Sequence, residues 1–460
     1  MLQTSEGRSG VKTSTDTTLA TVRGKMKRHV RRGAILVGAF AAIVFFPASV
    51  QGASTVFQIT HDNDRDAETS IAINPNDASN IVAGWISSGD HTCGFGVSDD
   101  GGATWSNGVV RGIQLTSGGS FDRGTDPSVA FDKSGNAYFS CLGFNLGPAS
   151  LGSAGTVYVA KSTDGGHSWG DPKAVFNSEA DPGNSLGSFE DHQFLTTNAK
   201  TGELYVTETR FRGAGKPDIM FSKSSDQNAT WTEPVAISDR GANATFQHSF
   251  SAAGKAAGTI YVTYFGYPSA KSPVRRIYLA KSADGGAQFS EPQVLSTDAG
   301  IPGIPGNLKV AVDQTTNQIY VNYADYDDGN GEVRVLRVLD AGDHFVVQGR
   351  TTVKTDPADQ FFPFVSVAPN GRVDVCYQDK GYLPGNSLIF TTCGFSTDHA
   401  VTFTNQQVTT TPFDASNNNF IGDYNWQAST NDAVYPIFVG DGVPGGDSNT
   451  EEVFVARVTP

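Results

Sequence analysis

Apolar residues along this 460-residue chain gather in short runs that recur about every 59 residues. Each unit begins with a five-residue strand, and the seven expected first strands are residues 70–74, 128–132, 193–197, 248–252, 309–313, 364–368 and 425–429. After a turn rich in Asn, Asp and Gly, a second and nearly unbroken apolar run follows. These second runs are residues 81–86, 137–142, 204–209, 259–265, 319–324, 373–378 and 433–438. Their lack of polar alternation indicates strands buried on both faces.

A third strand and a fourth strand complete each unit, with a polar octet between them. Residues 157–162 lead into one such octet, and residues 172–176 leave it. Four strands per unit, seven units and no helical period predict an all-β chain, with antiparallel four-stranded blades arranged as a β-propeller of about seven blades.

The two ends of the chain are expected to share one blade. The last unit has no octet and offers only three strands before the chain ends at Pro460. Residues 54–60 form a β-branched strand that belongs to no other unit. We predict that this strand completes the last blade and closes the ring, which would also remove an exposed sheet edge.

The octet itself has a recurring form, clearest at residues 162–169, which read Ser-Thr-Asp-Gly-Gly-His-Ser-Trp. Related octets begin at residues 98, 162, 224, 282, 338 and 396, and the one at 338 is the weakest. The Asp side chain can accept hydrogen bonds from its own turn, and Gly adopts positive φ without steric cost. The closing aromatic residue would plug the apolar layer beneath.

These six octets resemble the Asp box, or bacterial neuraminidase repeat, of the sialidase-like superfamily. The resemblance covers residues 54–460 and implies a structural turn between the third and fourth strands, on the rim away from the functional site. It therefore assigns to the fold, and not to chemistry, the residues Asp100, Asp164, Asp226, Asp284, Asp340 and Asp398.

The first 52 residues read as an extension and secretory signal, and residues 53–460 as the propeller. Basic residues from Lys25 to Arg32 precede an apolar run over 34–46, and small residues follow it. Met26 could be the true start. The run is short for a membrane span, so we expect no stable span after cleavage and a secreted or cell-envelope protein.

Removing these 52 residues leaves 25 basic and 45 acidic residues, a net charge of about −20. Such an acidic chain excludes nucleic acid as an expected partner, because phosphate binding needs a basic face. Four cysteines remain in the exported part, and none has metal-ligand spacing. We predict disulfides Cys93–Cys141, on neighbouring units, and Cys376–Cys393, on consecutive strands of one unit.

Candidate chemistry lies in the loops before the first strands and between the second and third strands, which ring one mouth of a propeller. Carboxylates, Arg, His and Tyr converge there from nearly every unit. The candidate catalytic residues are Asp62, Asp64, Glu190 and Tyr424. The candidate substrate-binding residues are Arg65, Arg123, Asp126, His192, Arg210 and Asp423.

The resemblance to sialidases implies roles for these residues in a glycoside hydrolase. Arg65, Arg123 and Arg210 or Arg212 would clamp a substrate carboxylate, because Arg binds carboxylates in bidentate fashion. Tyr424 would be the nucleophile, with Glu190 or Glu208 as its partner, and Asp62 or Asp64 the acid/base. The chain departs from sialidases in lacking a Phe-Arg-Ile-Pro signature and in having seven units instead of six.

Two alternatives stay open. One is another carbohydrate-active enzyme, a hydrolase or polysaccharide lyase, using paired carboxylates such as Asp64 with Asp126 or Glu190 with Asp423. In that case Trp85, Tyr267 and Tyr377 would stack against sugars. The other is a non-catalytic module that presents a glycan- or protein-binding surface. We expect a glycan or polysaccharide partner, a monomer, no required cofactor and no dedicated metal ligand set, although the acidic mouth could hold Ca²⁺.

Overall fold

The structure, a computed structural model, describes the propeller part of the chain with gaps. The described residues are 52–62, 65–87, 92–145, 155–177, 188–212, 217–238, 245–268, 272, 274–300, 307–385, 388–414, 420–441 and 450–460. The predicted N-terminal extension and signal lie outside the described residues. Among the described residues, no helix has the length and apolar character needed to cross a membrane.

Seven four-stranded antiparallel sheets make up the described chain, and each is one blade. Blade 1 holds β2 (Asp66–Asn74), β3 (Asp77–Ser87), β4 (Thr92–Ser98) and β5 (Ser106–Val109). Blade 2 holds β6 (Arg123–Phe131), β7 (Ala137–Phe144), β8 (Gly155–Ser162) and β9 (Lys173–Asn177). Blade 3 holds β10 (Ser188–Thr197), β11 (Leu204–Arg212), β12 (Asp218–Ser224) and β13 (Val235–Ala236). Blade 4 holds β14 (Thr245–Ala253), β15 (Ile260–Tyr267), β16 (Val274–Ser282) and β17 (Gln293–Ala299).

Blade 5 holds β18 (Leu308–Val312), β19 (Ile319–Asp325), β20 (Glu332–Asp340) and β21 (Phe345–Thr352). Blade 6 holds β22 (Gln360–Val367), β23 (Val373–Asp379), β24 (Phe390–Ser396) and β25 (Thr404–Gln407). Blade 7 holds β26 (Trp426–Ser429), β27 (Val434–Asp441), β28 (Glu451–Val458) and the N-terminal strand β1 (Ser54–Gln58). A short 3₁₀ helix, η1 (Leu115–Ser117), follows blade 1.

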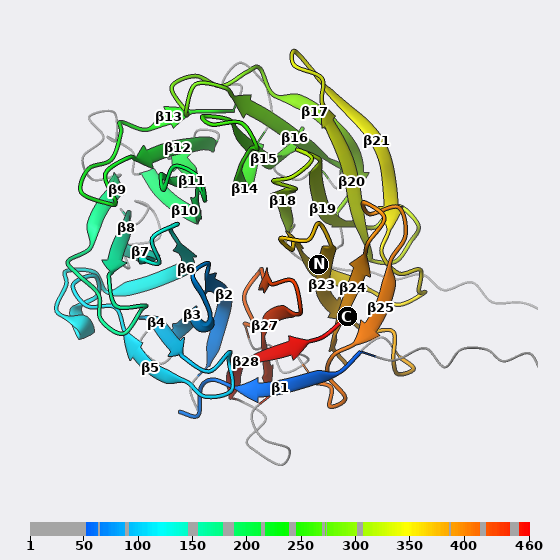
Figure 1. Cartoon of the computed structure of the whole chain (residues 1–460), viewed down its shortest axis with the longest axis horizontal. Helices are drawn as coiled ribbons and strands as arrows, with labels where there is room; N and C mark the ends of the chain where they lie inside the picture. Colours follow the sequence, from blue (N-terminus) through cyan, green and yellow to red (C-terminus); the bar gives the residue numbers. More distant parts are fainter. Residues whose placement is uncertain are drawn as a thin grey trace, which may run out of the picture. The chain divides into compact units, whose positions relative to one another are not determined.

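The first strands of the blades form the inner ring of the propeller. Each contacts the first strand of the next blade, and the contact between β26 and β2 completes the circle. Figure 1 shows β2, β6, β10, β14 and β18 nearest the centre and strands such as β5, β13 and β21 at the rim. The predicted seven-bladed β-propeller is therefore confirmed.

The ring closes as the sequence predicts, because β1 is the outermost strand of blade 7. It pairs antiparallel with β28, from Ser54 opposite Val458 to Gln58 opposite Phe454. Figure 1 shows the two strands side by side, β1 in blue and β28 in red. The C-terminal blade thus needs the N-terminal strand to cover the edge of β28.

Both predicted disulfides are present. Cys93 on β4 bonds to Cys141 on β7 and joins blade 1 to blade 2, with the Cα atoms 6.3 Å apart. Cys376 and Cys393 are directly opposite each other on β23 and β24, and they bond within blade 6. The described residues contain no free cysteine.

The octet at Ser162 forms the self-bonded turn that the sequence predicts. The Ser162 hydroxyl donates to Asp164 Oδ1 at 2.6 Å and accepts from the Gly166 amide at 2.8 Å. The Ser168 amide also donates to Asp164, at 2.9 Å. Trp169 then packs edge-on against Phe95 and Phe139, so the turn of blade 2 is fixed to the apolar layer between blades 1 and 2.

The octet at residue 338 is the exception because it lacks the Ser hydroxyl. Asp340 accepts from the Gly342 amide at 2.9 Å, as part of a tight hairpin between β20 and β21. Its other oxygen accepts from the Tyr261 hydroxyl at 2.7 Å and pairs with Lys281 at 2.6 Å. Asp340 therefore links blade 5 to blade 4 with one oxygen and braces its own turn with the other.

Candidate functional site

A repeated backbone irregularity marks one level of the inner ring. In five inner strands a non-glycine residue takes a left-handed backbone conformation with φ between 49° and 55°, namely Glu68, Asp126, His192, His248 and Phe362. Each lies where the pairing between the first and second strands of its blade shifts register. A non-glycine residue in this conformation costs roughly 1–3 kcal/mol, and such strain is concentrated at functional sites.

Four of these five bulge residues are titratable, and their side chains form one cluster. We call this cluster the mouth cluster, and it comprises Glu68, Asp126, Asp191, His192, His248, Asp423 and Tyr424. The His192 and His248 rings lie with centroids 4.3 Å apart, and the Tyr424 ring lies 5.2 Å from that of His192. The His192 amide donates to Asp126 Oδ2 at 3.2 Å. Residues from blades 1, 2, 3, 4 and 7 thus meet at one place.

The loop that carries Asp423 and Tyr424 into the cluster depends on Gly422. Gly422 has φ of 88°, and a Cβ there would lie 2.7 Å from both the backbone nitrogen and Cγ of Glu68. Only glycine fits this close approach in this conformation. The Tyr424 hydroxyl then donates to the Pro127 carbonyl at 3.5 Å and ties blade 7 to blade 2.

The carboxyl groups of the mouth cluster interact directly. Glu68 and Asp126 share a side-chain hydrogen bond, and Thr125 Oγ1 donates to Glu68 Oε2 at 3.4 Å. Burial and the neighbouring carboxylates raise the pKa of Glu68 and of Asp191 well above the usual range. Burial likewise raises the pKa of Asp126 and of Asp423 to about 6. Two carboxyl groups in one hydrogen bond hold a proton between them.

Burial has the opposite effect on the two imidazoles. It lowers the pKa of His192 well below 6.5, and it lowers that of His248 to about 4. Both rings are therefore neutral near pH 7. Within the described residues, no hydrogen bond reaches either ring nitrogen of His192 or Nδ1 of His248.

Beneath the mouth cluster lies a layer of side chains from equivalent positions of the inner strands. Strand pairing places Phe194, Phe250, Lys309 and Phe364 opposite Thr207, Thr263, Asn322 and Cys376, which occupy the same place in their blades. The buried Lys309 Nζ lies 3.4–4.2 Å from the ring centroids of the three Phe residues and Trp426. Burial lowers the pKa of Lys309 well below its usual value. This layer, the lysine cage, contacts the mouth cluster through Phe250, whose ring centroid lies 5.1 Å from that of His192.

The predicted Glu190 and Arg210 lie beside the mouth cluster as an ion pair. Arg210 Nε pairs with Glu190 at 3.0 Å, and its Nη2 pairs with Glu208 at 3.3 Å. Both glutamates are fully buried, and Arg210 is 6% exposed. The Arg210 guanidinium is therefore paired with two buried carboxylates of its own blade.

The other predicted arginines lie on different blades. Arg65 precedes β2, and its backbone forms an isolated parallel β-bridge with the backbone of Glu451 in blade 7. Arg123 begins β6 in blade 2. Arg65, Arg123 and Arg210 thus come from three separate positions around the ring. Asp64 lies outside the described residues, as does the side chain of Arg212.

Asp62 is exposed and forms a second acidic group with the buried Asp66 and Glu452. One oxygen from each lies within 4.8 Å of the others. Oxygen donors of this kind are those that Ca²⁺ prefers. The expectation that the acidic mouth could hold Ca²⁺ stays a prediction.

Two of the aromatic residues expected to stack against sugars are core residues. Trp85 is 3% exposed and Tyr377 is 2% exposed. A Cβ on Gly94 would lie 2.7 Å from the Trp85 indole nitrogen, so that ring fills space inside blade 1. The Tyr377 hydroxyl donates to Asn405 at 3.0 Å. The prediction was wrong for these two because an apolar second strand buries both of its faces.

Sequence reasoning placed Asp126, His192, Asp423 and Tyr424 at the mouth but selected neither Glu68 nor His248 as a site residue. The signal was available in the register of the repeats. In blades 1 to 4 the residue two positions before the inward residue of the first strand is Glu68, Asp126, His192 or His248. Four titratable residues at one position of a repeat indicate a shared cluster.

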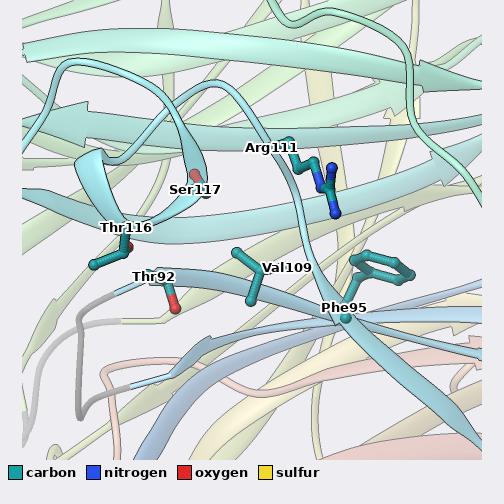
Figure 2. A pocket seen from close by; sticks show the side chains of 7 residues that line it. Thr92, Phe95, Val109, Arg111, Thr116 and Ser117 are labelled. Carbon is teal, nitrogen blue, oxygen red and sulfur yellow. The ribbon is translucent and has the colours of Figure 1, made fainter.

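A separate shallow pocket of ≈620 Å³ lies on blade 1. Its lining comes from β4, β5 and the connection that contains η1, with Thr92, Phe95, Gly108, Val109, Arg111, Thr116 and Ser117. Figure 2 shows Arg111 and Phe95 at one end of this pocket and Thr116 at the other. None of these residues belongs to the mouth cluster.

Several solved structures are similar to this chain at low sequence identity. A protein of unknown function from Dyadobacter fermentans is 15% identical over 89% of this chain and 98% of that chain, with a TM-score of 0.52. A polysaccharide lyase of family PL25, an ulvan lyase, is 14% identical over 86% of this chain and 95% of that chain, with a TM-score of 0.53. A leech intramolecular trans-sialidase is 14% identical over 73% and 68%, with a TM-score of 0.48. No family model matches the chain, and no curated protein matches it.

Proposed function

We propose that this chain is an exported, carbohydrate-active enzyme that cleaves a glycan at the mouth cluster, most simply as a glycoside hydrolase. The observation that carries the proposal is the hydrogen-bonded carboxyl pair of Glu68 and Asp126, which come from two different blades. The member of this pair that keeps its proton can act as the general acid of glycoside hydrolysis, which also needs a second carboxylate set further away. The proposal rests on the position of these groups.

Access to the pair runs through the less buried members of the cluster. Asp191, His248 and Asp423 are half-buried, whereas Glu68 and Asp126 are only 5% and 4% exposed. A sugar would therefore contact the half-buried side chains first. In this arrangement the Glu68–Asp126 pair donates its proton to the glycosidic oxygen, and the half-buried carboxylate of Asp191 accepts a proton from the water that attacks the anomeric carbon. Asp423 binds a sugar hydroxyl.

The charge of the mouth cluster favours a neutral glycan. Four carboxyl groups converge there, and a substrate carboxylate would be repelled. The exo-sialidase form of the proposal needs an arginine clamp, but Arg210 already pairs with Glu190 and Glu208. A sialoside is therefore one substrate to assay and not the preferred one.

A polysaccharide lyase is the second candidate, and a specific observation supports it. His192 and Tyr424 lie with ring centroids 5.2 Å apart, and a Tyr–His pair can move a proton from and to a sugar. The ulvan lyase of similar fold was solved bound to a saccharide of GlcA and sulfated Rha. A uronate would need a cation at the mouth to offset the carboxylates.

A substrate panel tests the proposal. The purified chain is incubated with aryl glycosides, including a sialoside, and with neutral and uronate-containing polysaccharides. New reducing ends without ultraviolet absorbance indicate hydrolysis, whereas absorbance from unsaturated uronate indicates the lyase reaction. If the folded chain binds glycans on an array but cleaves none of them, the non-catalytic alternative replaces the enzyme proposal. If it neither binds nor cleaves them, the carbohydrate proposal is overturned.

A further inference from the structure

We propose that His192, His248 and Asp423 bind a divalent transition-metal ion, with Zn²⁺ as the best fit. One donor atom from each residue lies within 4.8 Å of the other two. A tetrahedral Zn²⁺ site has metal–ligand bonds of about 2.0–2.2 Å, which place its donors roughly 3.3–3.5 Å apart. Small side-chain rotations would bring the three donors to that spacing.

The unsatisfied polar atoms of these residues support a ligand. Within the described part of the chain, no hydrogen bond reaches Nδ1 or Nε2 of His192, Nδ1 of His248 or Oδ1 of Asp423. His192 is 4% exposed, so both of its nitrogens are buried without a partner. Buried polar groups are almost always paired, because an unpaired one costs free energy. A metal ion would satisfy one nitrogen of each imidazole and the carboxylate oxygen together.

The backbone fixes the two histidines for this purpose. His192 and His248 occupy equivalent bulges on the neighbouring strands β10 and β14, with φ of 51° and 55°. These bulges hold the two rings with centroids 4.3 Å apart and planes tilted by 56°. Asp423 comes from the loop before β26 of blade 7. The ion would therefore connect blades 3, 4 and 7 and stabilise the ring.

The donor set selects the kind of metal. Two neutral imidazoles and one carboxylate suit Zn²⁺ and similar ions, whereas Ca²⁺ and Mg²⁺ prefer oxygen donors only. The acidic group of Asp62, Asp66 and Glu452 has that oxygen-only composition, so the chain contains an internal comparison. Three protein ligands leave one position of a tetrahedral ion for water or substrate, as in catalytic zinc sites.

The surroundings also favour a cation. Glu68, Asp126 and Asp191 bring three more carboxyl groups to the same cluster, where a divalent ion would offset their mutual repulsion. His248 and Asp423 are half-buried, which leaves a path for an ion to enter. The inference concerns the same cluster as the proposed function but does not depend on the reaction, because metal binding is measured without a sugar.

The test is a metal titration of the full exported chain after dialysis against EDTA. Co²⁺ is added while visible absorption is recorded, Zn²⁺ then displaces it, and retained zinc is measured by mass spectrometry. We expect about one equivalent per chain, a Co²⁺ spectrum typical of four or five ligands, and a higher melting temperature with Zn²⁺. His192→Ala, His248→Gln and Asp423→Asn should each weaken binding at least tenfold.

His344→Ala and Asp343→Asn serve as matched controls, because both residues are exposed on the β20–β21 hairpin. Circular dichroism establishes that each variant is folded, and the wild-type titration needs no variant at all. The inference is overturned if the wild type retains no zinc and shows no Co²⁺ absorption. It is also overturned if the three ligand variants bind like the controls, or if the wild type binds Ca²⁺ alone.

Discussion

The imidazole rings of His192 and His248 lie with centroids 4.3 Å apart, on left-handed bulges of neighbouring inner strands. Both histidines belong to the candidate site, and both occupy a bulge that recurs in the repeat. The bulge recurs in blades 1, 2, 3, 4 and 6, but the residue on it changes from Glu68 to Asp126, His192, His248 and Phe362. The fold supplies one geometry, and the side chains on it supply the chemistry.

The repeated turns should contribute stability and not activity. Asp164→Ala removes the acceptor of the Ser162 hydroxyl and the Ser168 amide. We expect a loss of about 1–2 kcal/mol in unfolding free energy, as for the loss of a capping residue. Asp171→Ala, at an exposed position in the next loop, is the control and should change stability by less than about 0.5 kcal/mol. Urea denaturation measures both, and equal losses would contradict the structural role of the turn.

Lys309 should make the free energy of unfolding increase as the pH rises into the alkaline range. Its pKa is lowered in the folded state, so the unfolded chain binds this proton more tightly. Stability should therefore rise with pH up to about 10.5, by at most about 1.4 kcal/mol per pH unit. Lys309→Met keeps the cage filled and removes the titrating group, and its stability should change less over the same range. Parallel unfolding curves of the variant and wild type from pH 7 to 10 would show that Lys309 does not titrate as inferred.

The two disulfides should differ in their contribution to stability. Cys93–Cys141 closes a sequence separation of 48 residues, and Cys376–Cys393 closes one of 17. Loop-closure entropy then gives about 4 kcal/mol for the first and about 3 kcal/mol for the second. Replacing each pair by Ala, one pair at a time, should lower the guanidinium midpoint more for the first. The reverse order would mean that strain or residual structure outweighs loop length.

Much of the fold could be predicted from the sequence, because each blade corresponds to one unit of the sequence repeat. The seven apolar second strands, the six octets and the unassigned strand at residue 54 were sufficient to predict seven blades, and the missing octet in the last unit indicated how the ring closes. The cysteine pairing followed from the same alignment of strands. Each of these features follows from the order and spacing of the repeated strands and turns.

The site could be predicted only in part. The composition of the loops was sufficient to predict Asp126, His192, Asp423 and Tyr424 as site residues. The positions of Glu68 and His248 depend on left-handed bulges, and no residue type in the sequence requires that backbone conformation. The sequence pattern predicts Lys309 only as the start of an ordinary strand, and the folded structure shows four aromatic rings around its side-chain nitrogen. The prediction for Trp85 and Tyr377 was wrong because the sequence pattern of an apolar run does not distinguish an aromatic residue in the core from one at a sugar-binding surface.

We propose that the mouth cluster carries the function of this protein and that the repeated turns only build the propeller. The most direct test compares two Asp→Asn variants of the folded chain on a glycan that the wild type cleaves. Asp126→Asn should lower kcat/KM by roughly 10²–10⁴ with little change in melting temperature. Asp164→Asn should lower the melting temperature while kcat/KM at 25 °C stays within about twofold of the wild type. Wild-type activity in Asp126→Asn, or its loss in a folded Asp164→Asn, would contradict the account.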